Sequence, residues 1–143
     1  MASQKELLRQ RQFAPLLRLD HTLNGAILLG LDGYIIEIQA RAMEVMKEPC
    51  SVASATSITG MATGAVKECL NRIAGAFAKL GIANSDVEIL INLAPADLPK
   101  YGTWLDLPLA IIMLQAAGIL PDLPETKEGD FILLRDFRLR GGG

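Results

Sequence analysis

The sequence contains few of the side chains on which metal sites and common catalytic groups depend. It has two cysteines, Cys50 and Cys69, and a single histidine, His21. The cysteines do not form a CxxC pair and no His/Cys cluster is present, so a zinc site and a histidine-based triad are both disfavoured. Cys69 falls on the apolar face of a predicted helix, where we expect a free, buried thiol.

The chain also lacks a charge excess and a membrane-spanning run. Its 14 basic and 16 acidic residues give a net charge of -2, so the domain as a whole carries no strong electrostatic footprint for nucleic acid. The longest apolar run, Leu107 to Pro121, is shorter than the roughly 20 residues of a transmembrane helix. Charges interrupt the N-terminus, which does not resemble a signal peptide. We expect a soluble, cytoplasmic protein with no membrane partner.

Apolar residues, by contrast, are plentiful enough for one domain. Half of the 143 residues are hydrophobic, and this length is typical of a single globular domain. We divide the chain into an N-terminal arm (1–20), one domain (21–137) and a C-terminal tail (138–143). Residues 3–18 are expected to be a frayed leader, with a docking helix for a neighbouring subunit as the alternative.

The first part of the domain has the period-two pattern of β-strands. Between Leu23 and Met43, two alternating runs flank Asp32-Gly33, a dipeptide typical of a type I′ hairpin turn. Residues 44–53 contain Pro49 and are predicted as a loop. In the second run one face should be buried (Ile36, Ile38, Ala40, Ala42) and the other exposed to water (Glu37, Gln39, Arg41).

A helix and two more strands are predicted next. The string SATSITG predicts a short third strand ending at Gly60, and helical spacing of apolar residues predicts a helix from about Gly64 to Leu80. Thr63 is the expected N-cap and Gly81 the expected C-terminal stop. The fourth strand is DVEILINL, in which Val87, Ile89, Ile91 and Leu93 face one side.

The last elements are a buried helix and a final strand. Residues 107–117 are almost entirely apolar, with Asp106 as the expected N-cap and Pro108 in the first turn, where its missing N–H does little harm. An acidic connector (121–130) leads to FILLRDF, the predicted last strand. The predicted order is therefore β-β-β-α-β-α-β.

Two stretches have the composition of binding loops. Gly60 to Lys67, GMATGAVK, is superficially similar to a Walker A loop, but its glycines are too close together, so we interpret it as a tight strand-to-helix turn. In the loop before the second helix, Asp97, Lys100 and Asp106 favour a solvated cluster over a charged site. The single tryptophan, Trp104, is interpreted as a packing residue rather than an exposed contact.

The longest specific string is NLAPADLPKYG (Asn92 to Gly102), followed by DLPLA (Asp106 to Ala110). With SITGMATGAVKECLNRIAGAFAKLGI before it, this string resembles the N-terminal domain of the magnesium-chelatase-like AAA+ ATPases of the ComM and YifB type, over roughly Gly25 to Leu134. The resemblance implies an α+β fold like that of the Lon protease domain and of a ribosomal-protein domain, with two helices on one side of a mixed sheet.

The same resemblance bears on catalysis. Lon-type proteases have a similar segment that carries a nucleophilic serine, and aligning Pro99-Lys100-Tyr101-Gly102 with it places Trp104 at the serine position. Tryptophan is not a nucleophile, and the partner lysine of that mechanism has no counterpart in this chain. Protease chemistry is therefore expected to be absent.

The resemblance implies a non-catalytic accessory domain for assembly or for engagement of substrate or DNA. Walker A and B motifs are absent from this chain, so ATP and magnesium are expected only at an ATPase module outside it, and we assign no catalytic, cofactor or metal residue. The implied partners are an AAA+ ATPase module or homo-oligomer neighbours, with DNA as a further candidate. The candidate functional surface comprises Lys67, Arg72, Lys79, Lys100 and Trp104.

Two alternatives remain from the sequence. One is a stand-alone nucleic-acid-binding module, which the ribosomal use of the fold suggests by analogy and the acidic pI disfavours. The other is a residual hydrolase that uses Thr103 or Ser57.

Overall fold

The computed structural model describes residues 20–121 and 132–133. The elements follow the predicted order: β1 (Asp20–Leu29), β2 (Asp32–Cys50), β3 (Thr56–Thr59), α2 (Thr63–Leu80), β4 (Ser85–Ala94), α3 (Asp106–Ala116) and β5 (Ile132–Leu133). The predicted leader, the C-terminal tail, nearly all of the acidic connector and most of the last strand lie outside the described residues.

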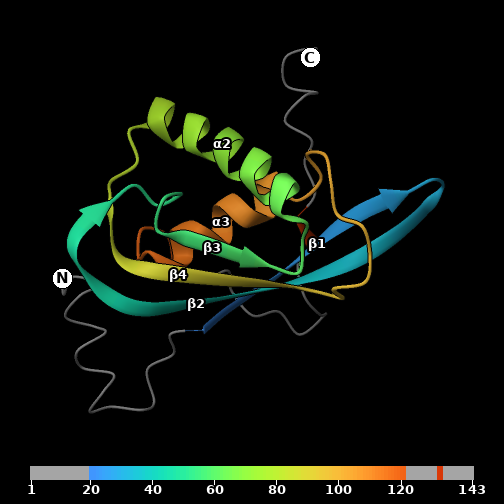
Figure 1. The fold of residues 1–143 in the computed structure, drawn as a ribbon, viewed down its shortest axis with the longest axis horizontal. Helices are drawn as coiled ribbons and strands as arrows, with labels where there is room; N and C mark the ends of the chain where they lie inside the picture. The colour runs from blue at the N-terminus through green and yellow to red at the C-terminus, as the bar shows by residue number, and fades with distance from the viewer. Residues whose placement is uncertain (1–19, 122–131, 134–143) are drawn as a thin grey trace.

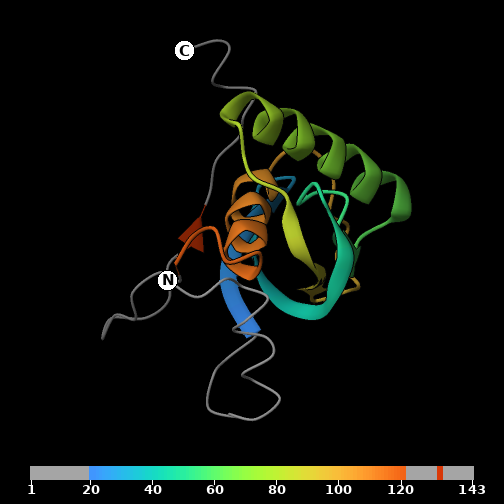
Figure 2. The same ribbon diagram turned by 90° about the vertical axis from the view of Figure 1, so that its left-hand side faces the viewer.

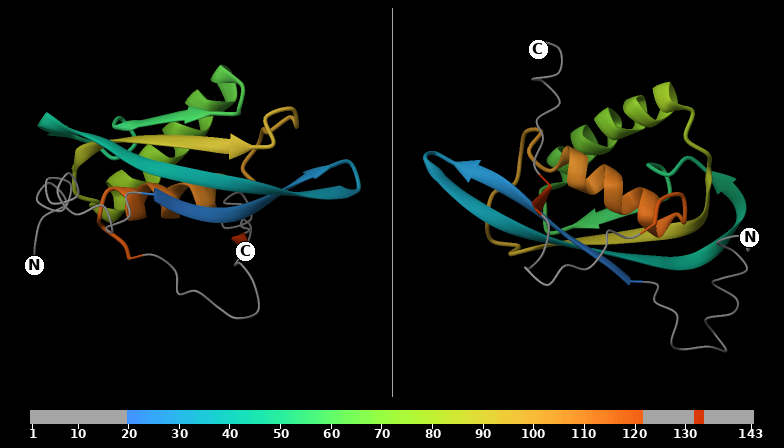
Figure 3. Two further views of the ribbon diagram at one scale, coloured as in Figure 1. Left: turned by 90° about the horizontal axis from the view of Figure 1, so that it is seen from below. Right: turned by 180° about the vertical axis from the view of Figure 1, so that it is seen from behind.

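The strands form one mixed sheet in the order β3-β4-β2-β1-β5. The central strand β2 is antiparallel to both β1 and β4, whereas β3 is parallel to β4 and β5 is parallel to β1. Both helices lie on the same side of this sheet (Figure 1), and the views from its left side and from below agree (Figures 2 and 3). The α+β prediction with two helices on one side of a mixed sheet is therefore confirmed.

The alternation of side chains along the strands explains why the helices cover one face. Residues of β2 and β4 that point towards the helices are buried, as predicted: Ile36, Ile38, Ala40, Ala42, Val87, Ile89, Ile91 and Leu93. Residues between them are mostly polar and exposed, including Glu37, Gln39 and Arg41. Burial of one apolar face against helices, with the polar face left to water, is the usual arrangement of an antiparallel sheet.

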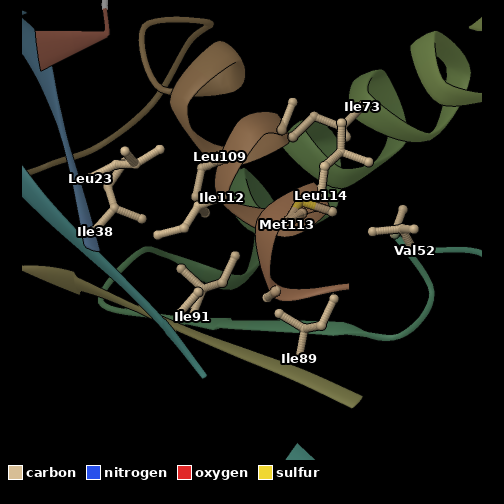
Figure 4. Close-up of a cluster of buried hydrophobic side chains, with 14 of the residues drawn as sticks. Leu23, Ile38, Val52, Ile73, Ile89, Ile91, Leu109, Ile112, Met113 and Leu114 are labelled. Carbon is tan, nitrogen blue, oxygen red and sulfur yellow. The ribbon is translucent and has the colours of Figure 1, made fainter. Parts of the chain in front are cut away.

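The helix α3 occupies the middle of the core. Figure 4 shows Leu109, Ile112 and Met113 of α3 between the sheet and Ile73 of α2, and these four side chains are fully buried. A helix that is apolar all round is expected to be enclosed in this way. Within the described residues, neither helix combines the length and apolar composition needed to cross a membrane.

The β1–β2 hairpin was predicted correctly, but its turn was misplaced. Leu29 pairs with Asp32, so the two central residues are Gly30 and Leu31, and Gly33 pairs with Leu28 inside the ladder. Gly30 has φ +64°, and no non-glycine residue among those described has positive φ. Positive φ is thus needed only at the first central position, as in a type II′ turn, and glycine meets that need there.

The predicted loop at 44–53 is corrected for residues 44–50, because β2 continues to Cys50, whereas residues 51–53 lie outside the strands and helices as predicted. The pairing of β2 with β4 shifts register between Ala42 and Val45 and again between Val45 and Cys50. Pro49 lies in the second irregular stretch, where its missing N–H interrupts no regular ladder.

The ends of α2 confirm one prediction and overturn another. Gly81 has φ +66°, and its N–H donates to the Ala78 carbonyl at 3.3 Å, so it ends the helix as expected. At the other end the N-cap is Ala62, which makes no side-chain cap bond, and Thr63 is already helical.

Candidate functional site

The loop between β4 and α3, residues 95–105, is the part of the domain with the most unusual chemistry. Gly102 has φ +76° and makes the turn that its position suggested. Leu105 and Thr103 are buried, and Trp104 is half-buried against the hydrophobic core. The interpretation of Trp104 as a packing residue is confirmed.

Asp106 begins α3 but does not cap it. The N-cap is Leu105, with no side-chain cap bond, so the predicted capping role is wrong. The Asp106 carboxylate is completely buried and binds Arg72 of α2 through two contacts, Nε to Oδ2 at 2.6 Å and Nη2 to Oδ1 at 3.0 Å. A buried carboxylate requires a partner of this kind, because its desolvation is otherwise costly.

Two further contacts extend this pair. Arg72 Nη2 donates to the Gly102 carbonyl at 2.8 Å, and the Cys69 thiol donates to Asp106 Oδ1 at 3.3 Å. Cys69 and Arg72 are three residues apart and therefore lie on the same side of α2. We call Cys69, Arg72, Asp106 and the Gly102 carbonyl the loop anchor, since together they fasten the loop and the start of α3 to α2.

The anchor perturbs the acidity of its members. Burial, together with the negative charge of Asp106, raises the pKa of the Cys69 thiol to about 12. The hydrogen bond to Asp106 raises the pKa of Arg72 above its ordinary value. Cys69 is therefore a neutral thiol at neutral pH, as predicted for a buried, free cysteine, and is not an activated nucleophile.

The predicted solvated cluster of Asp97, Lys100 and Asp106 does not form. Lys100 is only 4% exposed, and its Nζ donates to the Leu98 carbonyl at 2.9 Å. Burial lowers the pKa of Lys100, an effect that the charge of Asp97 partly opposes. Asp97 itself is exposed. The Lys100 side chain turns into the loop, and the Asp106 carboxylate binds Arg72 instead.

The five predicted surface residues have different environments. Lys67 and Lys79 are exposed on α2, as their spacing suggested. Arg72 was placed with them away from the apolar face, but its guanidinium is engaged in the loop anchor. Lys100 is buried and Trp104 is half-buried. A shared role for the five stays a prediction.

The residues weighed for a residual hydrolase lie on different elements. Thr103 is buried in the loop, whereas Ser57 is exposed on β3 opposite Leu90 of β4. The position that the resemblance aligned with a nucleophile holds the packed indole of Trp104. In the part of the chain that the structure describes, no group of three or more His, Cys, Asp or Glu side chains is placed to hold a metal ion.

The glycine at the end of β3 has a steric function. Gly60 has φ +88°, and a Cβ built there would lie 2.2 Å from the Leu93 carbonyl oxygen. Only glycine therefore fits where β3 ends beside the backbone of β4. This supports the interpretation of GMATGAVK as a tight strand-to-helix turn.

Comparison with known proteins identifies the family of the domain. The profile of the family described as "Subunit ChlI of Mg-chelatase" matches residues 43–142. This chain belongs to that family. The match begins within β2 and covers the loop anchor, and it confirms the predicted magnesium-chelatase-like domain of the ComM and YifB type.

Individual relatives agree with the family. The chain is 36% identical over 85 residues to "Uncharacterized protein YifB" of Escherichia coli, an alignment that covers 59% of this chain and 16% of the relative. It is 37% identical over 76 residues to "Competence protein ComM" of Haemophilus influenzae, covering 53% of this chain and 15% of the relative. The aligned part of the chain thus spans about a sixth of the length of these relatives.

Sequence reasoning missed the loop anchor as a unit. A signal was present, because Asp106 immediately precedes an apolar helix that had to be buried, so its carboxylate needed a cation. The identity of that cation was not readable, since Arg72 is 34 positions away in the sequence.

Proposed function

We propose that this domain is a non-catalytic accessory domain of a magnesium-chelatase-like protein, acting in assembly or in engagement of a substrate. The observation that carries the proposal is the state of the loop 95–105. Its turn carbonyl and the carboxylate that follows it are held by Arg72, and Trp104 is packed at the position aligned with a nucleophile. A loop in which Lys100, the Gly102 carbonyl and the following Asp106 carboxylate are already bonded within the domain supports a structural role better than a catalytic one.

ATP hydrolysis belongs, in this proposal, to an AAA+ ATPase module with which the domain works. Membership of the family supports that association, while the activity of the whole relatives is carried here only as a proposal. DNA is a second candidate ligand, supported by two exposed lysines on α2, Lys67 and Lys79. Glu68, next to Lys67, reduces the local positive potential there.

The catalytic half of the proposal is tested with the purified chain. We expect no hydrolysis of ATP with magnesium and no turnover of a panel of peptide and ester substrates. Turnover that disappears in Thr103→Val or in Ser57→Ala, with the fold intact by circular dichroism, would establish the hydrolase alternative and overturn the proposal.

The binding half separates assembly from DNA engagement. Sedimentation of the chain alone and mixed with a full-length YifB- or ComM-type protein should reveal association with a copy or with the longer protein. Fluorescence anisotropy with single- and double-stranded DNA at two salt concentrations measures the affinity for DNA, which is compared with the association seen by sedimentation. Affinity for DNA that falls steeply with salt and is lost in Lys67→Ala/Lys79→Ala would favour DNA engagement over assembly.

A further inference from the structure

The tip of the β1–β2 hairpin extends beyond the rest of the sheet. Pairing between β2 and β4 begins at Glu37 and Ala94, so the part of β2 before Glu37 pairs with β1 alone among the described strands. Figures 1 and 3 show this ribbon projecting from the body of the domain. Its exposed side chains are mainly large and apolar: Leu31 is 102% exposed, Ile35 58%, Leu28 47% and Tyr34 37%.

The turn itself does not require this composition. Only Gly30 needs positive φ, so the second central position accepts polar residues, which turns normally prefer. Leu31 nevertheless stands fully in solvent at the most projecting point of the hairpin. An apolar group of this kind, gathered on a protruding element, is typical of a contact with another protein surface.

Another strongly exposed apolar residue lies at the opposite end of the domain. Leu80, the last residue of α2, is 73% exposed, and the exposed Lys79 precedes it. The chain then enters β4, whose first residue, Ser85, pairs with Cys50 at the far end of β2 from the hairpin. Figure 1 shows the end of α2 on the left and the hairpin tip on the right.

The charges at the hairpin tip and at the end of α2 favour one pairing of these surfaces over the other. Asp32 is the only charged residue between Ala26 and Ile36. Two hairpin tips brought together would oppose their Asp32 carboxylates, whereas the Lys79–Leu80 end offers an apolar side chain beside a cation. We propose that the hairpin tip of one copy binds the Lys79–Leu80 end of α2 in the next copy, a head-to-tail contact that deepens and rests on the proposed role in assembly.

The contact is small. The four exposed side chains of the hairpin tip bury less than the roughly 800 Å² per partner of a stable interface. Association through this contact alone is therefore weak, and it becomes effective when other parts of a longer protein hold copies close together.

Cross-linking between variants that each carry one exposed cysteine tests the geometry. In a Cys50→Ser background, where only the buried Cys69 remains, Leu31→Cys and Leu80→Cys variants are mixed and oxidised with diamide. The expected product is the mixed Leu31→Cys/Leu80→Cys dimer, well above the yield with Ser57→Cys, an exposed control on β3. A dominant Leu31→Cys homodimer, or equal yields with the control, overturns the proposal.

Charge reversal tests the pairing of Asp32 with Lys79. Asp32→Lys alone and Lys79→Glu alone should each reduce the mixed cross-link several-fold at low salt, and combining the two reversed partners should restore it. Asp32 and Lys79 are exposed, so the temperature of unfolding should shift only slightly, Lys79→Glu lowering it because the last turn of α2 loses its cation. Thermal unfolding therefore verifies that each variant is folded. Single reversals without effect, or a tip-to-tip dimer strengthened by Asp32→Asn, contradict the head-to-tail contact.

Failure of this inference is distinguishable from failure of the proposed function. Concentration-dependent sedimentation without the mixed cross-link overturns the contact and leaves assembly through another surface. Hydrolytic turnover by the chain overturns the accessory role whether or not the cross-link forms.

Discussion

Two arginine–aspartate pairs in this domain have nearly the same geometry and very different surroundings. Arg72 and Asp106 meet at 2.6 Å with a second contact at 3.0 Å; Arg41 and Asp20 meet at 2.6 Å with a second contact at 3.2 Å. The side chains of the first pair are 34% and 1% exposed, and those of the second are 61% and 59% exposed.

The difference shows that the distance between two charges says little about their importance. The outer pair joins neighbouring strands, β1 and β2, which their backbone ladder already holds together, and water solvates both ions when the pair is broken. The inner pair joins α2 to α3 and to the loop before it. Breaking it leaves a carboxylate in the core, where water does not replace the lost partner.

At neutral pH the largest expected effect is that of Arg72→Ala. It removes the cation from a fully buried carboxylate and frees the Gly102 carbonyl, so the free energy of unfolding should fall by about 2–3 kcal/mol. This is below the range for fully buried pairs, because Arg72 is partly exposed. Urea unfolding at pH 7 measures it, with Arg41→Ala as the matched control. Equal shifts in the two variants would remove the distinction between the pairs.

The buried thiol makes the inner region sensitive to alkaline pH. The folded-state pKa of Cys69 is raised from 9.0 to about 12, so between these values the unfolded chain loses a proton that the folded chain retains. Stability is therefore complete below about pH 9 and falls as the pH rises towards 12, by up to about 1.4 kcal/mol per pH unit.

This dependence is measured as the difference between wild type and Cys69→Ala, because lysine and tyrosine titrations affect both chains alike. The difference in free energy of unfolding between the two chains at pH 7 gives the cost of the cavity that the substitution leaves. If this difference in free energy of unfolding stays constant from pH 7 to 11, the pKa of the Cys69 thiol is not raised by its burial beside Asp106.

A smaller effect is expected when the charge is kept and the shape is changed. Arg72→Lys retains a cation but loses the planar fork that contacts both Asp106 oxygens and the Gly102 carbonyl, so unfolding should become easier by about 1–2 kcal/mol. Arg41→Lys should leave the unfolding midpoint unchanged. If Arg72→Lys were also silent, charge alone would account for the inner pair.

The smallest effect belongs to the outer pair. Arg41→Ala should shift the unfolding midpoint only slightly at low salt, and the shift should vanish at high salt because exposed charges are screened. A salt-independent loss of stability as large as that of Arg72→Ala would mean that the outer pair is not solvated as the structure indicates.

The fold was predictable to the extent that it depends on local patterns. Alternation at Ile36–Ala42 and Val87–Leu93 identified two strands and their buried faces, and the apolar run of α3 identified a buried helix. Predictions that depended on one or two residues failed more often. Thr63 and Asp106 are residue types that often cap helices, but neither caps one here.

The candidate site was less predictable, because it depends on pairs that are distant in the sequence. Arg72 looked like a surface residue of α2, and Lys100 looked like part of a solvated cluster. Their actual partners, Asp106 and the Leu98 carbonyl, are selected by how the loop passes over α2 and by how its own backbone turns. A single sequence reports which side chains are present and does not report which of them meet.

The sequence by itself determined the class of the fold, the order of its elements and the family to which the domain belongs, because each follows from local periodicity or from a contiguous string. Only the tertiary structure decided that Asp106 is a buried anion held by Arg72 and Cys69, and that the β1–β2 hairpin extends apolar residues beyond the sheet. Burial and long-range pairing arise when the helices pack on the sheet, and these set the energy of an ion pair and the exposure of a leucine.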